Sequence, residues 1–175
     1  LDGDEFTPAL DEMPTERMVA QLDQMVGRYR SGEPLAYVMS RWSFRTLDLM
    51  VDRRVLIPRA ETELVAEHAI AAARSFSRRV VVDLGTGSGA IGLSMAAELP
   101  VDGTEVWLTD VSTDALDVAR ANVAAVGRGA ANVRIAQGSW YDALPTELRG
   151  HVNVIVAHPP YIAPDDPEVE DSVSE

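Results

Sequence analysis

The segment Asp83-Leu84-Gly85-Thr86-Gly87-Ser88-Gly89 is the first part of the sequence whose residue types and spacing could do chemistry. It follows a short apolar run, and its glycines stand at alternate positions. Such glycines let the backbone turn sharply and let a ligand lie directly on the main chain, where a Cβ would block it. Asp110 ends the next apolar run, and a carboxylate there can accept both hydroxyl protons of a ribose. The spacing predicts a nucleoside site.

Trp140 follows the third apolar run, where its indole could lie against an adenine ring. Two other interpretations remain open at this stage. Asp110 could serve only as a carboxylate at the entry to the next helix, and Trp140 could be an ordinary core aromatic.

The glycines alone do not identify the ligand. Gly85, Gly87 and Ala90 also satisfy the dinucleotide pattern G-x-G-x-x-G/A, and Asp110 would suit the ribose of NAD equally well. Asp83 favours a different ligand, because a carboxylate repels a pyrophosphate but attracts the ammonium and sulfonium groups of S-adenosylmethionine. We therefore predict S-adenosylmethionine, with NAD as the alternative.

A second candidate site follows the fourth apolar run, at His158-Pro159-Pro160-Tyr161. Consecutive prolines stiffen the backbone and remove two donors, which leaves carbonyl groups free to face a ligand. Tyr161 adds a flat aromatic face. The loop suits the positioning of a planar group, although a plain strand-ending loop is the alternative.

The elements that would position these residues alternate between strand and helix. Apolar periodicity predicts helices over residues 14–30, 61–74, 88–99 and 112–127, and strands over 80–84, 105–109, 133–136 and 152–157. Residues 47–51 and 55–57, around the polar turn 52–54, are predicted to form a β-hairpin. Alternating apolar strands and helices predict a doubly wound α/β fold with a mostly parallel sheet.

Composition excludes several classes of function. The chain has 28 acidic and 15 basic residues, all of the latter arginine, and a net charge of −13, which argues against a nucleic-acid substrate. It has no cysteine, hence no disulfide or thiolate site. His68, His151 and His158 lack the spacing of metal ligands, and Ser88 lacks the frame of a hydrolase nucleophile. Without a signal peptide or an apolar run long enough for a membrane span, a cytoplasmic location is expected.

Three separated segments make the chain resemble the HemK/PrmC family of peptide chain release factor glutamine N(5)-methyltransferases. Residues 30–38 and 55–63 match the family's entry region, residues 83–89 with 109–110 match its cofactor core, and His158-Pro159-Pro160-Tyr161 stands where the family has Asn-Pro-Pro-Tyr. The resemblance implies a Rossmann-like class I methyltransferase fold and a glutamine-bearing loop of a release factor as the protein substrate. The acidic charge and the lack of a long apolar run predict neither direct nucleic-acid binding nor membrane binding.

The resemblance also implies roles for individual residues and a division of the chain. The 158–161 loop would hold the glutamine, with His158 also beside the cofactor, and the cofactor-binding residues would be Asp83, Gly85, Thr86, Gly87, Ser88, Gly89, Asp110 and Trp140. We expect residues 1–45 to be the stub of a helical substrate-recognition domain and 46–58 a β-hairpin linker. Residues 59–175 would be the S-adenosylmethionine-binding domain, incomplete at its C-terminus.

Three positions depart from the family pattern: His158 replaces asparagine, Ser139 replaces a common acid, and Ala60 replaces a usual proline. A neutral imidazole offers one acceptor nitrogen and a protonated one offers none, so His158 puts activity in question. The alternatives are therefore a ribosomal-protein glutamine methyltransferase, an adenine amino-methyltransferase acting on nucleic acid, and a catalytically impaired relative that binds the cofactor.

Overall fold

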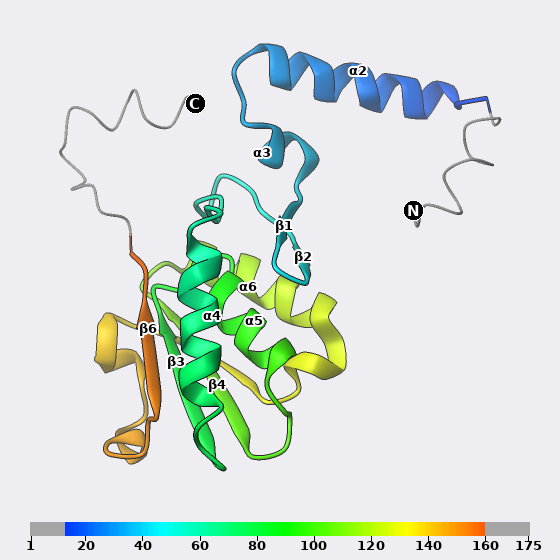
Figure 1. The fold of residues 1–175 in the computed structure, drawn as a ribbon. Coiled ribbons are helices and arrows are strands. Elements are labelled where there is room, and N and C mark those ends of the chain that lie inside the picture. The colour runs from blue at the N-terminus through cyan, green and yellow to red at the C-terminus, as the bar shows by residue number, and fades with distance from the viewer. Residues whose placement is uncertain (1–12, 160–175) are drawn as a thin grey trace.

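Four parallel strands form the main sheet of the computed structural model, which describes residues 13–159 (Figure 1). They are β3 (Arg79–Leu84), β4 (Thr104–Asp110), β5 (Val133–Gln137) and β6 (Val154–Ala157), in the order β5-β4-β3-β6. The chain runs outward from β3 to β5 and then crosses back to the other side of β3. The strand order therefore reverses between β3 and β6, and ligands of open α/β sheets bind at the carboxyl ends of strands at such a point.

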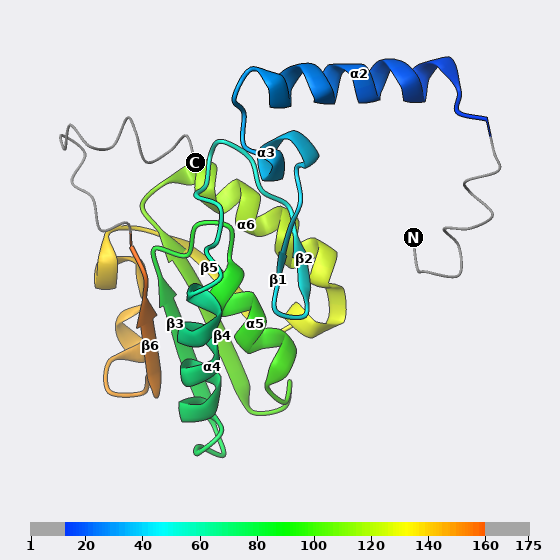
Figure 2. The ribbon, with the colours of Figure 1, turned by 45° about the horizontal axis from the view of Figure 1, so that its top comes forward.

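Helices α4 (Thr62–Ala73), α5 (Ala90–Glu98) and α6 (Thr113–Val126) pack next to one another along the sheet (Figures 1 and 2). The return connection from β5 to β6 runs in the opposite direction, so a right-handed crossover carries it over the other face. It contains two 3₁₀ helices, η2 (Trp140–Ala143) and η3 (Thr146–Leu148), and η2 contacts β4. The predicted Rossmann-like, doubly wound class is confirmed.

Apolar burial explains why these segments form these elements. Strand β3 is buried over nearly its whole length, and residues 90–96 of α5 are all buried. Helix α6 begins at the N-cap Ser112, whose hydroxyl accepts from the Ala115 amide at 3.2 Å, and it ends before Gly127 at φ +64°. A further 3₁₀ turn, η1 (Gly127–Ala130), leads toward β5. Both ends of α6 agree with the boundaries predicted from the sequence.

A β-hairpin is present, and the predicted strand at 47–51 is confirmed over residues 47–49, but its predicted partner at 55–57 was wrong. The hairpin pairs β1 (Trp42–Phe44) with β2 (Leu47–Leu49), and residues 55–57 are not a strand. Phe44 and Leu49 are each 1% exposed, so this register buries one large apolar side chain from each strand. The turn falls at Arg45, which has a φ of +52°. Burial of Phe44, absent from the predicted hairpin, decided the pairing.

Residues 50–61, here called the connecting segment, lead from β2 to α4. The Val55 amide donates to the Asp52 carbonyl in a turn at 3.0 Å, and the Val55 carbonyl accepts from the Tyr37 hydroxyl at 2.7 Å. The Val55 backbone groups are therefore engaged in contacts that a strand at 55–57 would need to replace.

The N-terminal segment, residues 13–49, contains α2 (Glu16–Arg30), α3 (Leu35–Met39) and the hairpin. Helix α2, predicted over 14–30, begins after Thr15, whose hydroxyl accepts from the Met18 amide at 3.3 Å. The helix projects away from the sheet, and none of its residues is buried (Figures 1 and 2). Helix α3 was not predicted. No helix within residues 13–159 is both long and apolar enough to cross a membrane.

Candidate active site

The glycine loop, residues 85–89, follows β3 at the carboxyl edge of the sheet. Gly85 and Gly87 have φ values of +69° and +54°, and a Cβ added to either would meet no atom within 4 Å. A Cβ at Gly89 would instead lie 3.0 Å from the Leu93 side chain. The first two glycines therefore leave open space above the main chain, whereas Gly89 permits close packing of α5 on its own loop.

Asp110 ends β4 and is hydrogen-bonded to the glycine loop. Its Oδ2 accepts from the Gly87 amide at 3.0 Å, and its Oδ1 accepts from the Ser112 amide at 2.9 Å. The bond to Ser112 makes Asp110 a helix-entry carboxylate, as one interpretation of the sequence held. Each carboxylate oxygen can accept a further bond, so the same side chain retains capacity for ribose hydroxyl groups.

Asp83 lies beneath the glycine loop and is 2% exposed. Its Oδ2 accepts from the Thr86 hydroxyl at 2.7 Å and from the Gly92 amide at 2.9 Å, which places a carboxylate at the N-terminus of α5. Burial raises the pKa of Asp83 to about 6, against the opposing effect of these two hydrogen bonds. Asp83 thus fixes the glycine loop through these hydrogen bonds and also provides negative charge on the buried side of that loop.

Trp140 opens η2 and is 56% exposed, which contradicts the interpretation that it is a core aromatic. Its φ of +48° is an uncommon conformation for a bulky residue. The turn folds back tightly, because a Cβ at Gly138 would lie 2.7 Å from the Cα of Ala143. The Gly138 amide donates to the Asp110 carbonyl at 3.0 Å, so the backbone just before Trp140 is connected to the end of β4.

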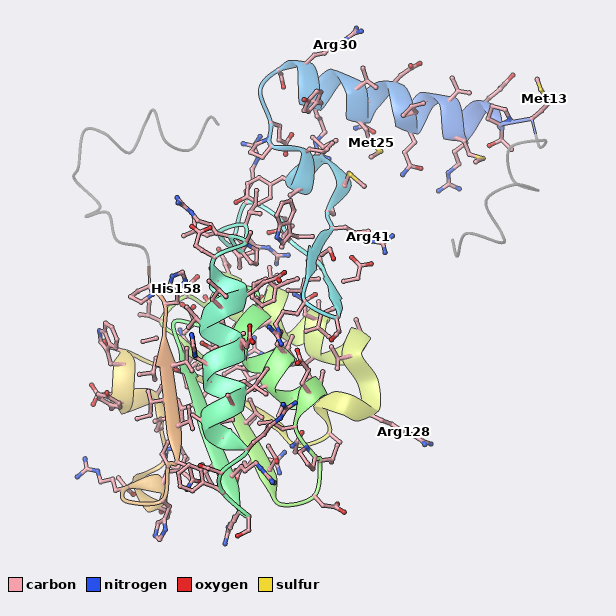
Figure 3. All side chains as sticks on the ribbon, in the orientation of Figure 1. Met13, Met25, Arg30, Arg41, Arg128 and His158 are labelled. Atoms are coloured by element: carbon pink, nitrogen blue, oxygen red, sulfur yellow. The ribbon has the colours of Figure 1, made fainter. Side chains whose placement is uncertain are left out.

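His158 directly follows β6, whose Ala157 pairs with Leu84 of β3 (Figure 3). The half-buried side chain therefore lies across from the glycine loop, and its proximity lowers the pKa of Asp83 to a small extent. Its Nδ1 lies 3.4 Å from the hydroxyl of Thr62, the first residue of α4. Pro159 lies beside it, half-buried, while Pro160 and Tyr161 fall outside the described residues.

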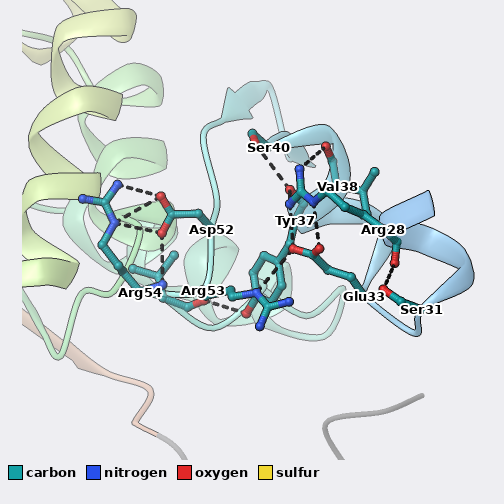
Figure 4. A network of polar contacts seen from close by, with 10 residues as sticks. Arg28, Ser31, Glu33, Tyr37, Val38, Ser40, Asp52, Arg53 and Arg54 are labelled. Atoms are coloured by element: carbon teal, nitrogen blue, oxygen red, sulfur yellow. Dashed lines mark hydrogen bonds and ion pairs between the residues drawn. The ribbon is translucent and has the colours of Figure 1, made fainter. Parts of the chain in front are cut away.

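A polar network joins the end of α2 to the segment that follows it and to the connecting segment (Figure 4). Arg28 donates to both carboxylate oxygens of Glu33 at 2.6 and 2.7 Å, and to the carbonyl of Tyr37 at 3.0 Å. Arg53 of the connecting segment reaches Glu33 at 3.4 Å. The hydrogen bond from Arg28 is the main cause that lowers the pKa of Glu33 to about 2. The network joins α2 to the connecting segment rather than to the strand ends.

Sequence reasoning missed two polar residues around the site, Thr62 and Asn122. Thr62 could not have been found, because its contact with His158 joins residues far apart in the chain. Asn122 carried a signal, since it continues the apolar face of α6 formed by Ala115, Val118 and Ala119. A polar residue on a buried helical face needs hydrogen-bond partners in the interior.

The predicted cofactor can be tested against this arrangement. Open main chain at Gly85 and Gly87 accommodates a ligand, and Asp110 offers acceptors to a diol beside it. Asp83 and Asp110 give this edge of the sheet negative charge, which suits a ligand carrying ammonium and sulfonium groups and opposes a pyrophosphate. The residues present fit S-adenosylmethionine, and they would hold its ribose at Asp110.

Comparison with known proteins gives matches over most of the chain. Residues 60–173 match the family model of the methyltransferase small domain. A release factor glutamine methyltransferase of Xylella fastidiosa (strain 9a5c) is 45% identical over 145 residues, which are 83% of this chain and 50% of the relative. One from Burkholderia pseudomallei is 42% identical, over 81% of this chain and 50% of the relative. The chain therefore spans about half the length of the curated relatives it matches.

Among solved structures, the catalytic domain of hMettl16 in complex with MAT2A 3′UTR hairpin 6 superposes with a TM-score of 0.52 at 19% identity. The match covers 73% of this chain and 42% of that one. At this level of identity the similarity concerns the fold.

Proposed function

This chain belongs to the methyltransferase small domain family, and we propose that it transfers a methyl group from S-adenosylmethionine to the side-chain amide nitrogen of a glutamine in a peptide chain release factor. The resemblance to the HemK/PrmC family noted in the sequence is confirmed by the family match and by the relatives above. Family membership likewise supports S-adenosylmethionine as the cofactor. The substrate protein is part of the proposal.

One observation supports the proposal most strongly, namely the meeting of three strand ends at the reversal of strand order. The glycine loop follows β3, Asp110 ends β4, and His158 follows β6 on the other side of β3. The Asp110 carboxylate and the glycine loop are directly hydrogen-bonded at 3.0 Å. A cofactor on the loop and an acceptor group at His158 would therefore be neighbours.

The chemistry requires positioning more than activation. When bound, S-adenosylmethionine supplies a methyl group on a sulfonium, which is already a good leaving group. An amide nitrogen is a poor nucleophile because its lone pair is delocalised into the carbonyl. The protein must therefore align the amide and accept a hydrogen bond from each of its two N–H hydrogens once water is excluded.

We assign one of the two hydrogen-bond acceptors to the side chain of His158 and the other to a main-chain carbonyl of the 158–161 loop. Thr62 would decide which ring nitrogen is available: if Nδ1–H donates to the Thr62 hydroxyl, Nε2 carries the lone pair and accepts from the substrate. His158→Asn should remain active, because its amide oxygen can also accept a hydrogen bond from the substrate amide.

The proposal is tested by incubating the protein with candidate release factors and isotopically labelled S-adenosylmethionine. Mass spectrometry of proteolytic peptides should find one labelled methyl group on a glutamine. His158→Ala should lower turnover while leaving cofactor affinity within about twofold of the parent. A turnover for His158→Ala equal to that of the parent would contradict the role given to His158.

Three outcomes would replace the proposed substrate or activity. Label in a ribosomal-protein glutamine but not in a release factor would change the substrate protein. Label in an adenine-containing oligonucleotide alone would identify a nucleic-acid methyltransferase, which the net charge of −13 opposes. Cofactor binding with no transfer to any of these substrates would indicate a catalytically impaired relative.

A further inference from the structure

A single buried amide, that of Asn122, connects the glycine loop to the connecting segment. Asn122 lies on α6 and is 1% exposed. Its Nδ2 donates to the Ser88 carbonyl at 2.8 Å and to the Met50 carbonyl at 3.0 Å. Its Oδ1 accepts from the Met50 amide at 2.7 Å. Three segments that are distant in sequence therefore meet at one side chain.

The orientation of this amide follows from its partners. Two carbonyl oxygens face Nδ2 and one N–H faces Oδ1, so a flipped amide would oppose oxygen to oxygen and N–H to N–H. Both Nδ2 hydrogens and one acceptor position of Oδ1 are used, which leaves the buried group well satisfied. Loss of the side chain would leave the carbonyls of Ser88 and Met50 and the amide of Met50 to find other partners.

The two partners of Asn122 have different places in the proposed function. Ser88 belongs to the glycine loop, between the open turn at Gly87 and the first residue of α5. Met50 begins the connecting segment directly after β2, whose hairpin also contacts α4 and α5 through Arg45. Movement of the Ser88 carbonyl would therefore change the hydrogen bonds of Met50 through one rigid amide.

We propose that Asn122 is a positioning residue for the cofactor site, and that it couples cofactor binding at the glycine loop to the placement of the connecting segment. This inference rests on the proposed function, because it takes the glycine loop as the cofactor site. Asn122 contacts no reacting group. It holds the Ser88 carbonyl, and thus the turn at Gly87–Gly89, in the arrangement that the cofactor meets.

The test uses the whole 175-residue chain labelled with ¹⁵N and titrated with S-adenosylhomocysteine. In the parent, the NMR chemical shifts of the Met50 amide and of the Asn122 side-chain amide should change during the titration. Each change should give the same Kd as the change at the Gly87 amide. Asn122→Ala should weaken the affinity about tenfold or more, and Met50 should no longer respond. The matched control is Leu116→Ala, a fully buried apolar residue of the same helix, whose affinity should stay within twofold of the parent.

The outcomes separate this inference from the proposed function. If the parent binds S-adenosylhomocysteine while Met50 and Asn122 do not respond, the coupling is wrong and the cofactor site stands; this holds even if no variant folds. An Asn122→Ala affinity equal to that of the parent, or an equal loss in Leu116→Ala, also overturns the positioning role. A parent that binds no S-adenosylhomocysteine overturns the proposed function and, with it, the inference.

Discussion

Helices α2 and α6 have similar apolar periodicity, yet they differ in burial. In α6, Leu116 and Ala119 are completely buried against the sheet. In α2, Leu22 and Tyr29 recur at the same kind of spacing but are each 59% exposed, and no residue of the helix is buried. Periodicity therefore shows which face of a helix is apolar, whereas the packing partner decides whether that face is covered.

The difference extends to the forces that hold the two regions. The sheet and its helices share one apolar core, in which Leu93, Met95 and Leu108 are fully buried. Helix α2 is attached through the bidentate pair of Arg28 with Glu33 and through hydrogen bonds to main-chain carbonyls. The effects of substitutions on the free energy of unfolding should thus differ between the two regions, both in size and in their dependence on pH.

The largest difference is expected from a matched pair of leucine substitutions. Leu108→Ala should lower the free energy of unfolding by about 2–5 kcal/mol, because it removes a fully buried side chain and leaves a cavity. Leu22→Ala, at an exposed position of α2, should change it by no more than about 0.5 kcal/mol. Chemical denaturation of both variants measures this. Equal losses would mean that α2 packs in solution against a surface absent from this fold.

The second prediction concerns Asp83. Its folded-state pKa of about 6 lies above its ordinary value of 3.8, so the native state binds more protons between these values. The stability from Asp83 is fully present below its unfolded pKa and is lost as pH rises through about 6, an effect on the order of 3 kcal/mol.

Asp83→Asn removes this titration and keeps an oxygen that can accept from Thr86 and Gly92. The stability of the variant relative to the cofactor-free parent should therefore increase between about pH 4 and 6 and be constant above that range. Urea unfolding at several pH values gives the difference. A difference that does not vary with pH would show that Asp83 is not the buried titrating group.

The third prediction separates the regions by cofactor affinity. Asp110→Ala should weaken S-adenosylmethionine binding by roughly 1.5–3 kcal/mol, the range for hydrogen bonds to a charged group. Glu33→Gln in the N-terminal network should leave the affinity within about twofold of the parent. Isothermal titration compares the two variants, and an unchanged affinity for Asp110→Ala would place the ribose elsewhere.

The smallest expected effect concerns the Arg28–Glu33 pair. The pKa of Glu33 is lowered from 4.5 to about 2, so its contribution to the stability of the fold is present above pH 4.5 and is lost as pH falls toward 2. This dependence of stability on pH is opposite in sign to that of Asp83. Glu33→Gln should abolish this dependence and increase amide exchange in α2 without a measurable change in the melting temperature. Exchange of α2 as slow as in the parent would show that other contacts hold the helix.

Much of the fold could be predicted from the chain because its local signals agree with its tertiary structure. Residues 80–82 form a short apolar run, as a strand covered on both faces requires, and Ser112 and Gly127 are suited to the two ends of a helix. Glycine spacing at 85–89 likewise indicated a sharp turn that only small residues permit, and two of its positions proved open.

Other features depended on contacts between distant residues. Residues 47–49 pair with 42–44 instead of 55–57 because burial of Phe44 outweighed the polar turn that the sequence offered at 52–54. Alternation alone does not select a register, since the choice depends on which side chains the neighbouring elements can cover. The apolar face of α2 is likewise exposed because no neighbouring element covers it within the described residues.

The candidate site shows the same division. Residue types and spacing by themselves determined that a glycine loop, Asp110 and His158 would lie at the ends of three strands, because the carboxyl ends of parallel strands share one edge of a sheet. Only the tertiary structure decided that Asp83 is buried beneath the loop, that Thr62 meets His158, and that Asn122 joins Ser88 to Met50. These contacts depend on how α4, α5 and α6 pack on the sheet, and that packing depends on the whole core.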